Sequence, residues 1–171
     1  TGYPVEFSPA KNMVWKTAVP FGQSSPVLAG GRISLTASEP GKLLTLALDE
    51  KTGKELWRRE IPKVSFTKTY KPNDPASPTP AADTDGVVAF FADFGLIAYD
   101  TAGKERWKRP MGPFQNFYGM ASSPVIAGNM VIQVVDEQKA PYVIALDRKT
   151  GAQRWKTPRT AGVGWSTPVV Y

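Results

Sequence analysis

One short stretch recurs along the chain and restricts its fold more than any other feature. Residues 47–57 run Ala-Leu-Asp-Glu-Lys-Thr-Gly-Lys-Glu-Leu-Trp, residues 98–107 repeat this pattern one residue shorter, and residues 145–155 repeat it in full. Residues 13–16 keep only the tryptophan end of the pattern. The four tryptophans stand 42, 50 and 48 residues apart. A repeat of this length, built from strand-like units, is typical of a β-propeller or a related array.

Each repeat contains four short apolar runs separated by Gly, Pro or Asp turns, which is the pattern of a four-stranded antiparallel meander. The first run opens with Ser/Thr-Pro, which a strand tolerates at its start because the proline there loses no ladder bond. The sequence therefore predicts an all-β fold, a β-propeller fragment of about three four-stranded antiparallel blades. We expect a linker over 1–12 and a partial propeller over 13–171, which begins with a lone strand at 14–19. The blades are expected over about 24–62, 76–112 and 121–159, and their first strands at 24–29, 79–82 and 123–127. The first strand of an incomplete blade is expected from 165.

The residues that recur in the repeat have a structural interpretation. An aspartate before a Thr-Gly turn accepts hydrogen bonds from backbone N–H groups two residues further on, and the glycine supplies a positive φ. A tryptophan at the end of the outer strand covers the seam between neighbouring sheets. We expect these roles at Asp49, Gly53, Trp57, Asp100, Gly103, Trp107, Asp147, Gly151 and Trp155.

Composition narrows the chemistry. The sequence contains neither cysteine nor histidine, which removes thiolate chemistry, the usual general base and the commonest metal ligand. The formal net charge is +6, with the charges spread through all repeats, so no nucleic-acid partner is expected. No apolar run reaches the length of a membrane span. The open first and last blades favour self-association of the chain.

The repeat resembles that of the pyrroloquinoline-quinone-type (PQQ-like) β-propellers. The resemblance rests on Ser-Pro-Val at a first strand and Ala-Leu-Asp-x-x-Thr-Gly-x-x-x-Trp at the outer hairpin, and it covers roughly residues 13–171. That family contains quinoprotein dehydrogenases, which hold the quinone and a calcium ion, and non-catalytic propellers that act as scaffolds. The dehydrogenases carry a vicinal cysteine pair that this sequence lacks. The resemblance implies a periplasmic or otherwise extracytoplasmic location.

The loops between blades carry the residues that do not recur. In a four-stranded meander these connectors share one face with the loops between second and third strands, while the Asp-Thr-Gly turns lie on the opposite face. The connector over 63–75 is much longer than a turn requires, and such loops are commonly functional. Aromatic residues with a few polar neighbours form either a ligand or peptide surface or a plug that packs the channel. The candidate surface comprises Tyr70, Lys71, Asn73, Asp74, Asn116, Tyr118 and Trp165.

These observations predict a propeller without catalytic residues in this chain, which binds a ligand or a protein partner through its inter-blade loops. The alternative is part of a quinone-dependent dehydrogenase whose cofactor residues lie outside the chain. The quinone and calcium belong to that alternative alone, and neither the protein nor the small-molecule partner is identified by the sequence.

Overall fold

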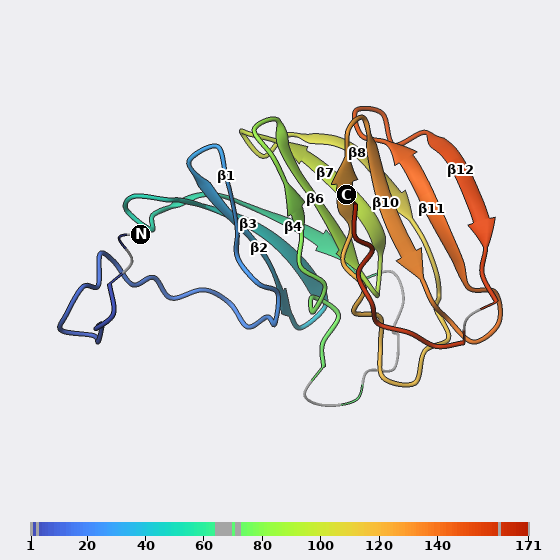
Figure 1. The fold of residues 1–171 in the computed structure, drawn as a ribbon, viewed down its shortest axis with the longest axis horizontal. Helices are drawn as coiled ribbons and strands as arrows, with labels where there is room; N and C mark the ends of the chain where they lie inside the picture. The colour runs from blue at the N-terminus through green and yellow to red at the C-terminus, as the bar shows by residue number, and fades with distance from the viewer. Residues whose placement is uncertain (1, 3, 64–69, 71–72, 161, 171) are drawn as a thin grey trace.

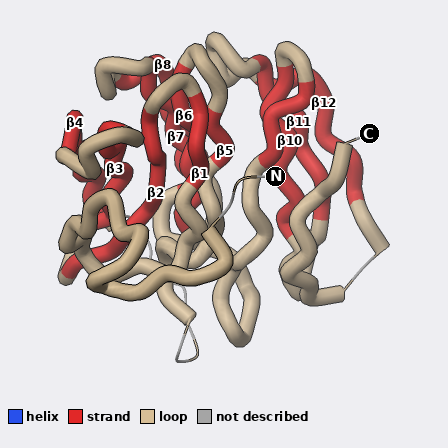
Figure 2. The backbone as a smooth tube through the Cα atoms, turned by 60° about the vertical axis from the view of Figure 1, so that its left-hand side comes forward, coloured by secondary structure: helices blue, strands red, loops and turns tan. Residues whose placement is uncertain are grey.

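A computed structural model describes residues 2, 4–63, 70, 73–160 and 162–170 of the chain. These residues contain strands and loops but no helix (Figure 2). Twelve strands form three four-stranded antiparallel sheets that stand side by side like blades (Figure 1). The strands are β1 Val27–Ala29, β2 Arg32–Glu39, β3 Lys42–Asp49 and β4 Glu55–Pro62 in blade one; β5 Ala81–Ala82, β6 Gly86–Phe91, β7 Gly95–Asp100 and β8 Glu105–Pro110 in blade two; and β9 Val125–Ala127, β10 Met130–Val135, β11 Tyr142–Asp147 and β12 Gln153–Pro158 in blade three. The predicted all-β propeller fragment is confirmed.

The central strands of blade two are buried because sheets cover both of their faces. All residues of β6 after Gly86 are buried, and so is β7 up to Tyr99. The side chains on one face of blade two form an apolar cluster with blade one. The side chains on its other face form a second apolar cluster with blade three. Because successive side chains of a strand point to opposite faces, a strand buried on both sides must be apolar throughout.

Three tryptophans, one before blade one and one each from blades one and two, pack on the turn glycine of the blade that follows. The indole N–H donates to a backbone carbonyl of that same turn, at 2.8–3.0 Å. A Cβ built on the glycine would lie only 2.4–2.7 Å from the indole ring, and the glycine φ lies between 67° and 76°. The turn position therefore requires glycine both for its φ and for the space that the ring occupies. The three pairs are Trp15 on Gly53, Trp57 on Gly103 and Trp107 on Gly151.

The first strand of each blade is shorter than the sequence predicts. The Ser/Thr-Pro residues before it form hydrogen bonds between blades instead of ladder bonds. Each hydroxyl that precedes the proline accepts a hydrogen bond from the equivalent backbone N–H of the preceding blade, at 2.9–3.1 Å. The donors are Ser25, Thr79 and Ser123, and their acceptors are Thr79, Ser123 and Thr167. Residues 24–26, 79–80 and 123–124 therefore lie outside the strands, and the side chains link neighbouring blades.

The two end segments contact the sheets without belonging to one of the twelve strands. Residues 14–19 lie in none of the twelve strands and contact blade one through side chains: Thr17 Oγ1 donates to the Gly53 carbonyl at 2.7 Å. Residues 166–170 likewise begin no assigned strand, and the Ser166 carbonyl accepts from Ser122 Oγ at 2.9 Å. The N-terminal residues project away from the sheets (Figure 1).

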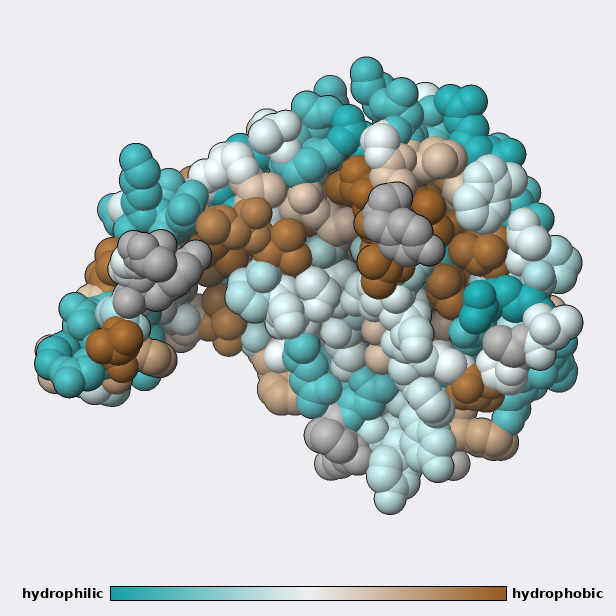
Figure 3. All heavy atoms as spheres, viewed as in Figure 1, coloured by the Kyte–Doolittle hydropathy of each residue, from teal (hydrophilic) through white to brown (hydrophobic). Residues whose placement is uncertain are grey.

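The molecule has two opposite faces. The turn face carries the first hairpins and the turns after β3, β7 and β11, at the upper edge of blades two and three in Figure 1. The loop face carries the connectors between blades and the loops between second and third strands, at the lower edge. The upper rim is largely hydrophilic, whereas the lower end is mostly of intermediate hydropathy (Figure 3).

Candidate functional site

Three aromatic side chains of the loop face lie in a continuous row, although they come from three separate segments. The Tyr70 and Tyr118 ring centroids are 5.7 Å apart at an interplanar angle of 81°. The Tyr118 and Trp165 centroids are 5.8 Å apart at 60°. These are edge-to-face and tilted contacts, which aromatic pairs prefer over face-to-face stacking. We call Tyr70, Tyr118 and Trp165 the aromatic row.

The aromatic row remains open to solvent despite these contacts. Tyr70 is 67% exposed, Tyr118 51% and Trp165 43%. Phe117, next to the row in sequence, is 65% exposed. Because four large aromatic residues remain this exposed on one end of the molecule, the surface has the composition of a protein-binding site. The sequence analysis left Phe117 out of the candidate set, although its position beside Tyr118 was a usable signal.

Hydrogen bonds between neighbouring segments hold the row in position. The Asn73 side-chain amide donates to the Tyr118 carbonyl at 2.5 Å, and the Trp165 indole N–H donates to the Gly119 carbonyl at 3.1 Å. Asn116 Oδ1 accepts from the Tyr118 backbone N–H at 3.1 Å. Each bond ties one inter-blade connector to itself or to the next, so the row has a defined geometry.

Two of the predicted surface residues are buried and serve the connectors. Asn116 is buried and donates to the Asp136 carbonyl at 3.3 Å. Asp74 is buried, and its Oδ1 accepts from the Ala76 N–H at 2.6 Å. Burial raises the pKa of Asp74 above its ordinary value of 3.8, because the charged form loses hydration. Asp74 Oδ2 has no hydrogen-bond partner in the described part of the chain. These two residues therefore support the surface from beneath and do not line it. Lys71 lies outside the described residues.

The aspartates of the turn face show the opposite electrostatic behaviour. Asp49 Oδ1 accepts from the backbone N–H and hydroxyl of Thr52 at 2.8 and 2.7 Å, and Asp147 Oδ1 accepts from the same groups of Thr150 at 2.9 Å. A bond from Arg154, followed by those from Thr150, lowers the pKa of Asp147. The Thr52 hydroxyl is the main cause of the lowered pKa of Asp49. These carboxylates are fully engaged in shaping their turns.

Asp100, in the shorter turn, accepts from the backbone N–H groups of Ala102 and Lys104 at 2.9 and 2.8 Å, without a threonine hydroxyl. The aspartate thus keeps its role when the turn loses a residue. Asp147 also pairs with Arg154, at 2.6 Å.

The described residues contain no group of three or more His, Cys, Asp or Glu side chains that could hold a metal ion. No helix in the described part of the chain is long and apolar enough to cross a membrane.

The three repeated blades, their tryptophan–glycine seams and the aromatic connectors define a class of protein: part of a β-propeller of the PQQ-like type. The family model described as outer membrane protein assembly factor BamB matches residues 7–166. The chain belongs to this family. The resemblance expected from the repeat is thereby confirmed.

A curated relative agrees with this assignment. The outer membrane protein assembly factor BamB of Alkalilimnicola ehrlichii is 29% identical over 164 residues, which cover 87% of this chain and 36% of the relative. The chain therefore spans little more than a third of that relative's length.

Solved structures share the fold. The quinohemoprotein alcohol dehydrogenase ADHIIG of Pseudomonas putida HK5 matches with a TM-score of 0.59 and 19% identity, over 81% of this chain and 21% of that enzyme. The quinohemoprotein alcohol dehydrogenase of Comamonas testosteroni matches with a TM-score of 0.58 and 21% identity, over the same shares. At these identities the likeness concerns the fold alone.

Proposed function

We propose that this chain is the partner-binding part of a non-catalytic propeller scaffold and that its loop face, centred on the aromatic row, holds a protein partner. The family name, outer membrane protein assembly factor, makes a protein of outer-membrane assembly the partner class to test first. The same family membership supports a periplasmic or otherwise extracytoplasmic location.

The observation that carries this proposal is the aromatic row itself. Exposed tyrosine and tryptophan rings on a rigid base are the side chains that most often dominate protein interfaces, because they bury a large area and lose few rotatable bonds. Tyr70, Tyr118 and Trp165 come from different connectors, yet the Asn73 and Trp165 hydrogen bonds fix them as one patch. A partner would therefore meet a preorganised surface.

Site-specific photo-crosslinking in cells tests the proposal. A photoreactive phenylalanine derivative replaces Tyr118, and the matched control carries the same group at Lys51, an exposed residue of the turn face. We expect a discrete protein adduct from position 118 and none from position 51. Identification of that adduct as a protein of outer-membrane assembly would support the partner class.

Two results would contradict the proposal. The first is the absence of any adduct from position 118 when the protein is folded and present at its normal level. The second is the same set of adducts from both positions, because that would show that the two faces do not differ in partner binding.

Self-association of the 171-residue chain is a separate expectation that follows from its outer faces. Trp155 of blade three is 38% exposed, and Val169 and Val170 near the end of the chain are also exposed. On blade one, a groove of about 320 Å³ is lined by apolar side chains that include Ile33 and Leu35. Open apolar faces of this kind favour association. We expect light scattering at about 100 μM to give a mass above that of the monomer, and a stable monomer would contradict this expectation.

A further inference from the structure

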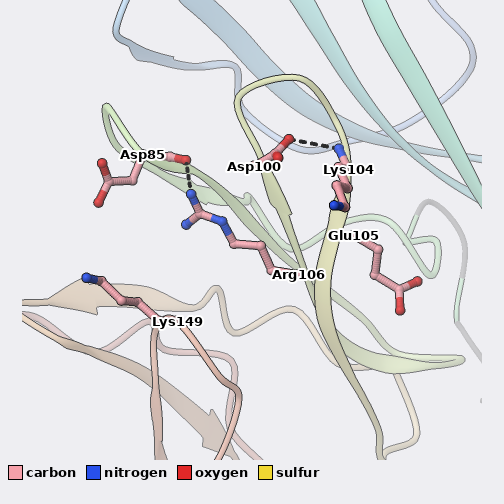
Figure 4. Close-up of a pocket in the computed structure, with 6 residues that line it drawn as sticks. All are labelled: Asp85, Asp100, Lys104, Glu105, Arg106 and Lys149. Atoms are coloured by element: carbon pink, nitrogen blue, oxygen red, sulfur yellow. Dashed lines mark hydrogen bonds between the residues drawn. The ribbon is translucent and has the colours of Figure 1, made fainter.

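A second site lies on the turn face, between blades two and three, well away from the aromatic row. It is a cavity of about 600 Å³ whose walls consist almost entirely of charged side chains. Figure 4 shows Lys149 on the opposite side of the cavity from Arg106 and the Asp100 turn, with its ammonium group turned to the side. The lining residues are Asp85, Asp100, Lys104, Glu105, Arg106 and Lys149.

The carboxylates of this cavity are already engaged. Asp85 Oδ2 accepts a bond from Arg148 NH2 at 2.7 Å. Asp100 Oδ1 accepts the two backbone bonds of its turn. Glu105 pairs with Lys108 at 3.2 Å, and its carboxylate points away from Arg106 and Lys149 (Figure 4). A carboxylate that is already paired or turned away contributes little negative potential to the open space.

The cations, in contrast, are largely uncommitted. Within the described part of the chain, the ammonium groups of Lys104 and Lys149 make no hydrogen bond or ion pair. Arg106 uses one nitrogen, NH2, in a bond of 2.7 Å to the Asp85 carbonyl. Directly beside the cavity, Arg106 and Arg148 share the lining of a smaller space of about 10 Å³, where Arg148 is ion-paired with Asp83 and Asp85. The six lining side chains carry three positive and three negative charges, but the carboxylates are engaged elsewhere, so the unused N–H donors of the cations are what the site offers to a ligand.

We propose that this cavity binds the phosphate group of a phosphate ester. Lys104, Arg106 and Lys149 reach it from both blades, and donors on several sides suit a group with three terminal oxygens better than a flat carboxylate with two. A volume of about 600 Å³ lies within the range of small-molecule sites and exceeds the needs of inorganic phosphate. The cavity has room for an organic part beside the phosphate, and either a soluble phosphate ester or a phospholipid headgroup would supply that part. This site is independent of partner binding at the loop face.

The repeat itself supplies a matched control for the test. Lys149 follows Asp147 by two residues in its turn, and Lys51 follows Asp49 by two residues in the equivalent turn of blade one. Both lysines are exposed, but only Lys149 lines the cavity. A change from lysine to glutamine at either position alters the net charge equally, so any difference between them reports on the cavity.

Isothermal titration calorimetry with glycerol 3-phosphate measures the affinity of the wild-type protein and of the two variants. We expect Lys149→Gln to weaken binding about tenfold or more and Lys51→Gln to leave it unchanged. Lys104→Gln should act like Lys149→Gln, and Lys149→Arg should retain most of the affinity because the charge and donors remain. Circular dichroism confirms that each variant is folded before titration.

A competition experiment distinguishes a phospholipid headgroup from a soluble phosphate ester as the ligand. Vesicles of phosphatidylglycerol in phosphatidylcholine compete with glycerol 3-phosphate if the site accepts a lipid headgroup, and they leave the titration unchanged if it accepts only soluble esters. The proposal is overturned if glycerol 3-phosphate does not bind the wild-type protein at millimolar concentration. It is also overturned if Lys51→Gln and Lys149→Gln weaken binding equally, because binding would then depend on net charge alone.

Discussion

The turn face and the loop face of this protein are built on opposite plans. On the turn face, the same aspartate, glycine and tryptophan occupy the same positions in all three repeats. Each aspartate accepts backbone bonds within its turn, and each glycine receives the tryptophan of the preceding segment or blade. On the loop face, each connector has its own sequence and length, and its aromatic residues meet only in space. The difference shows that repetition marks the residues that join blade to blade, whereas the residues without counterparts form the surface available to a partner.

The charged cavity between blades two and three refines this comparison because it lies on the repetitive face. It is formed where the repeat departs from itself, beside the shortened turn after Asp100 and opposite Lys149. A departure from the repeat can therefore create a site even where the architecture is most regular.

The largest effect on stability should come from the seam tryptophans. We expect Trp107→Ala to lower the free energy of unfolding by about 3–5 kcal/mol, because it empties a buried site between two blades and removes the bond to the Arg148 carbonyl. Trp155→Ala should cost much less, since no further blade covers this ring in the structure. Urea denaturation measures both values. Equal losses at the two positions would show that the seam is not what stabilises the turn face.

The next effect tests the glycine that receives the tryptophan. Gly151→Ala and Gly128→Ala both place a Cβ at positive φ, which costs about 1–2 kcal/mol in each case. At position 151 the new Cβ would also lie 2.7 Å from the Trp107 ring, whereas at position 128 no atom lies within 4 Å. We therefore expect Gly151→Ala to be the more destabilising variant in thermal unfolding. If the two variants unfold alike, the close packing of ring on glycine contributes nothing.

The dependence of stability on pH should have opposite signs on the two faces. The pKa of Asp147 is lowered in the folded state, chiefly by Arg154, so its contribution to stability is present above the unfolded pKa near 3.8 and is lost as pH falls through the folded value. The pKa of Asp74 is raised by burial, so its contribution is present below the unfolded value and is lost as pH rises through the folded value.

Thermal unfolding of Asp147→Asn, Asp74→Asn and the wild type checks this difference. The melting temperatures are measured from about pH 2 to about pH 7, a range that includes the titration of ordinary carboxylates. Asp147→Asn should be less stable than wild type at pH 7, and the gap should close in acid. Asp74→Asn should match or exceed wild type at pH 7 and lose that advantage in acid. The same pH profile for both variants would contradict the assignment of opposite shifts.

The smallest effect on stability belongs to the aromatic row. Tyr118→Ala should cost only about 1 kcal/mol, the value of its two ring contacts, because the residue is half exposed. The same change should remove partner binding in a pull-down with the crosslinked partner as bait. Leu56→Ala, on blade one and away from the aromatic row, is the matched control because Leu56 is 50% exposed and Tyr118 is 51% exposed; this variant should retain partner binding. A loss of stability as large as that of Trp107→Ala would identify the row as a structural plug.

Much of the fold followed from local sequence signals. The hairpin turns, the twelve strands and their grouping into three sheets depend on alternation, on apolar runs and on turn residues, all of which act over a few positions. The first strands were predicted too long because the hydroxyls of Thr79 and Ser123 bond to another blade, and a bond between blades leaves no local pattern.

The candidate site was only partly visible for the same reason. The aromatic residues were recognised as unusual, but the exposure of Tyr118 and the burial of Asp74 and Asn116 depend on how the connectors fold over one another. Phe117 and the cavity cations Lys104 and Lys149 were missed. Lysine in a turn is ordinarily solvated, and nothing in the sequence distinguishes Lys149 from Lys51.

The sequence by itself determined that this protein is a stack of four-stranded blades joined through tryptophan and glycine, because a repeated pattern of strands and turns can bury its apolar faces only against copies of itself. The tertiary structure alone decided which unrepeated side chains meet. It brings Tyr70, Tyr118 and Trp165 from three connectors into one row and sets Lys149 opposite Arg106 across two blades. Contacts between residues far apart in the chain depend on the packing of whole blades, and that packing sets both surfaces.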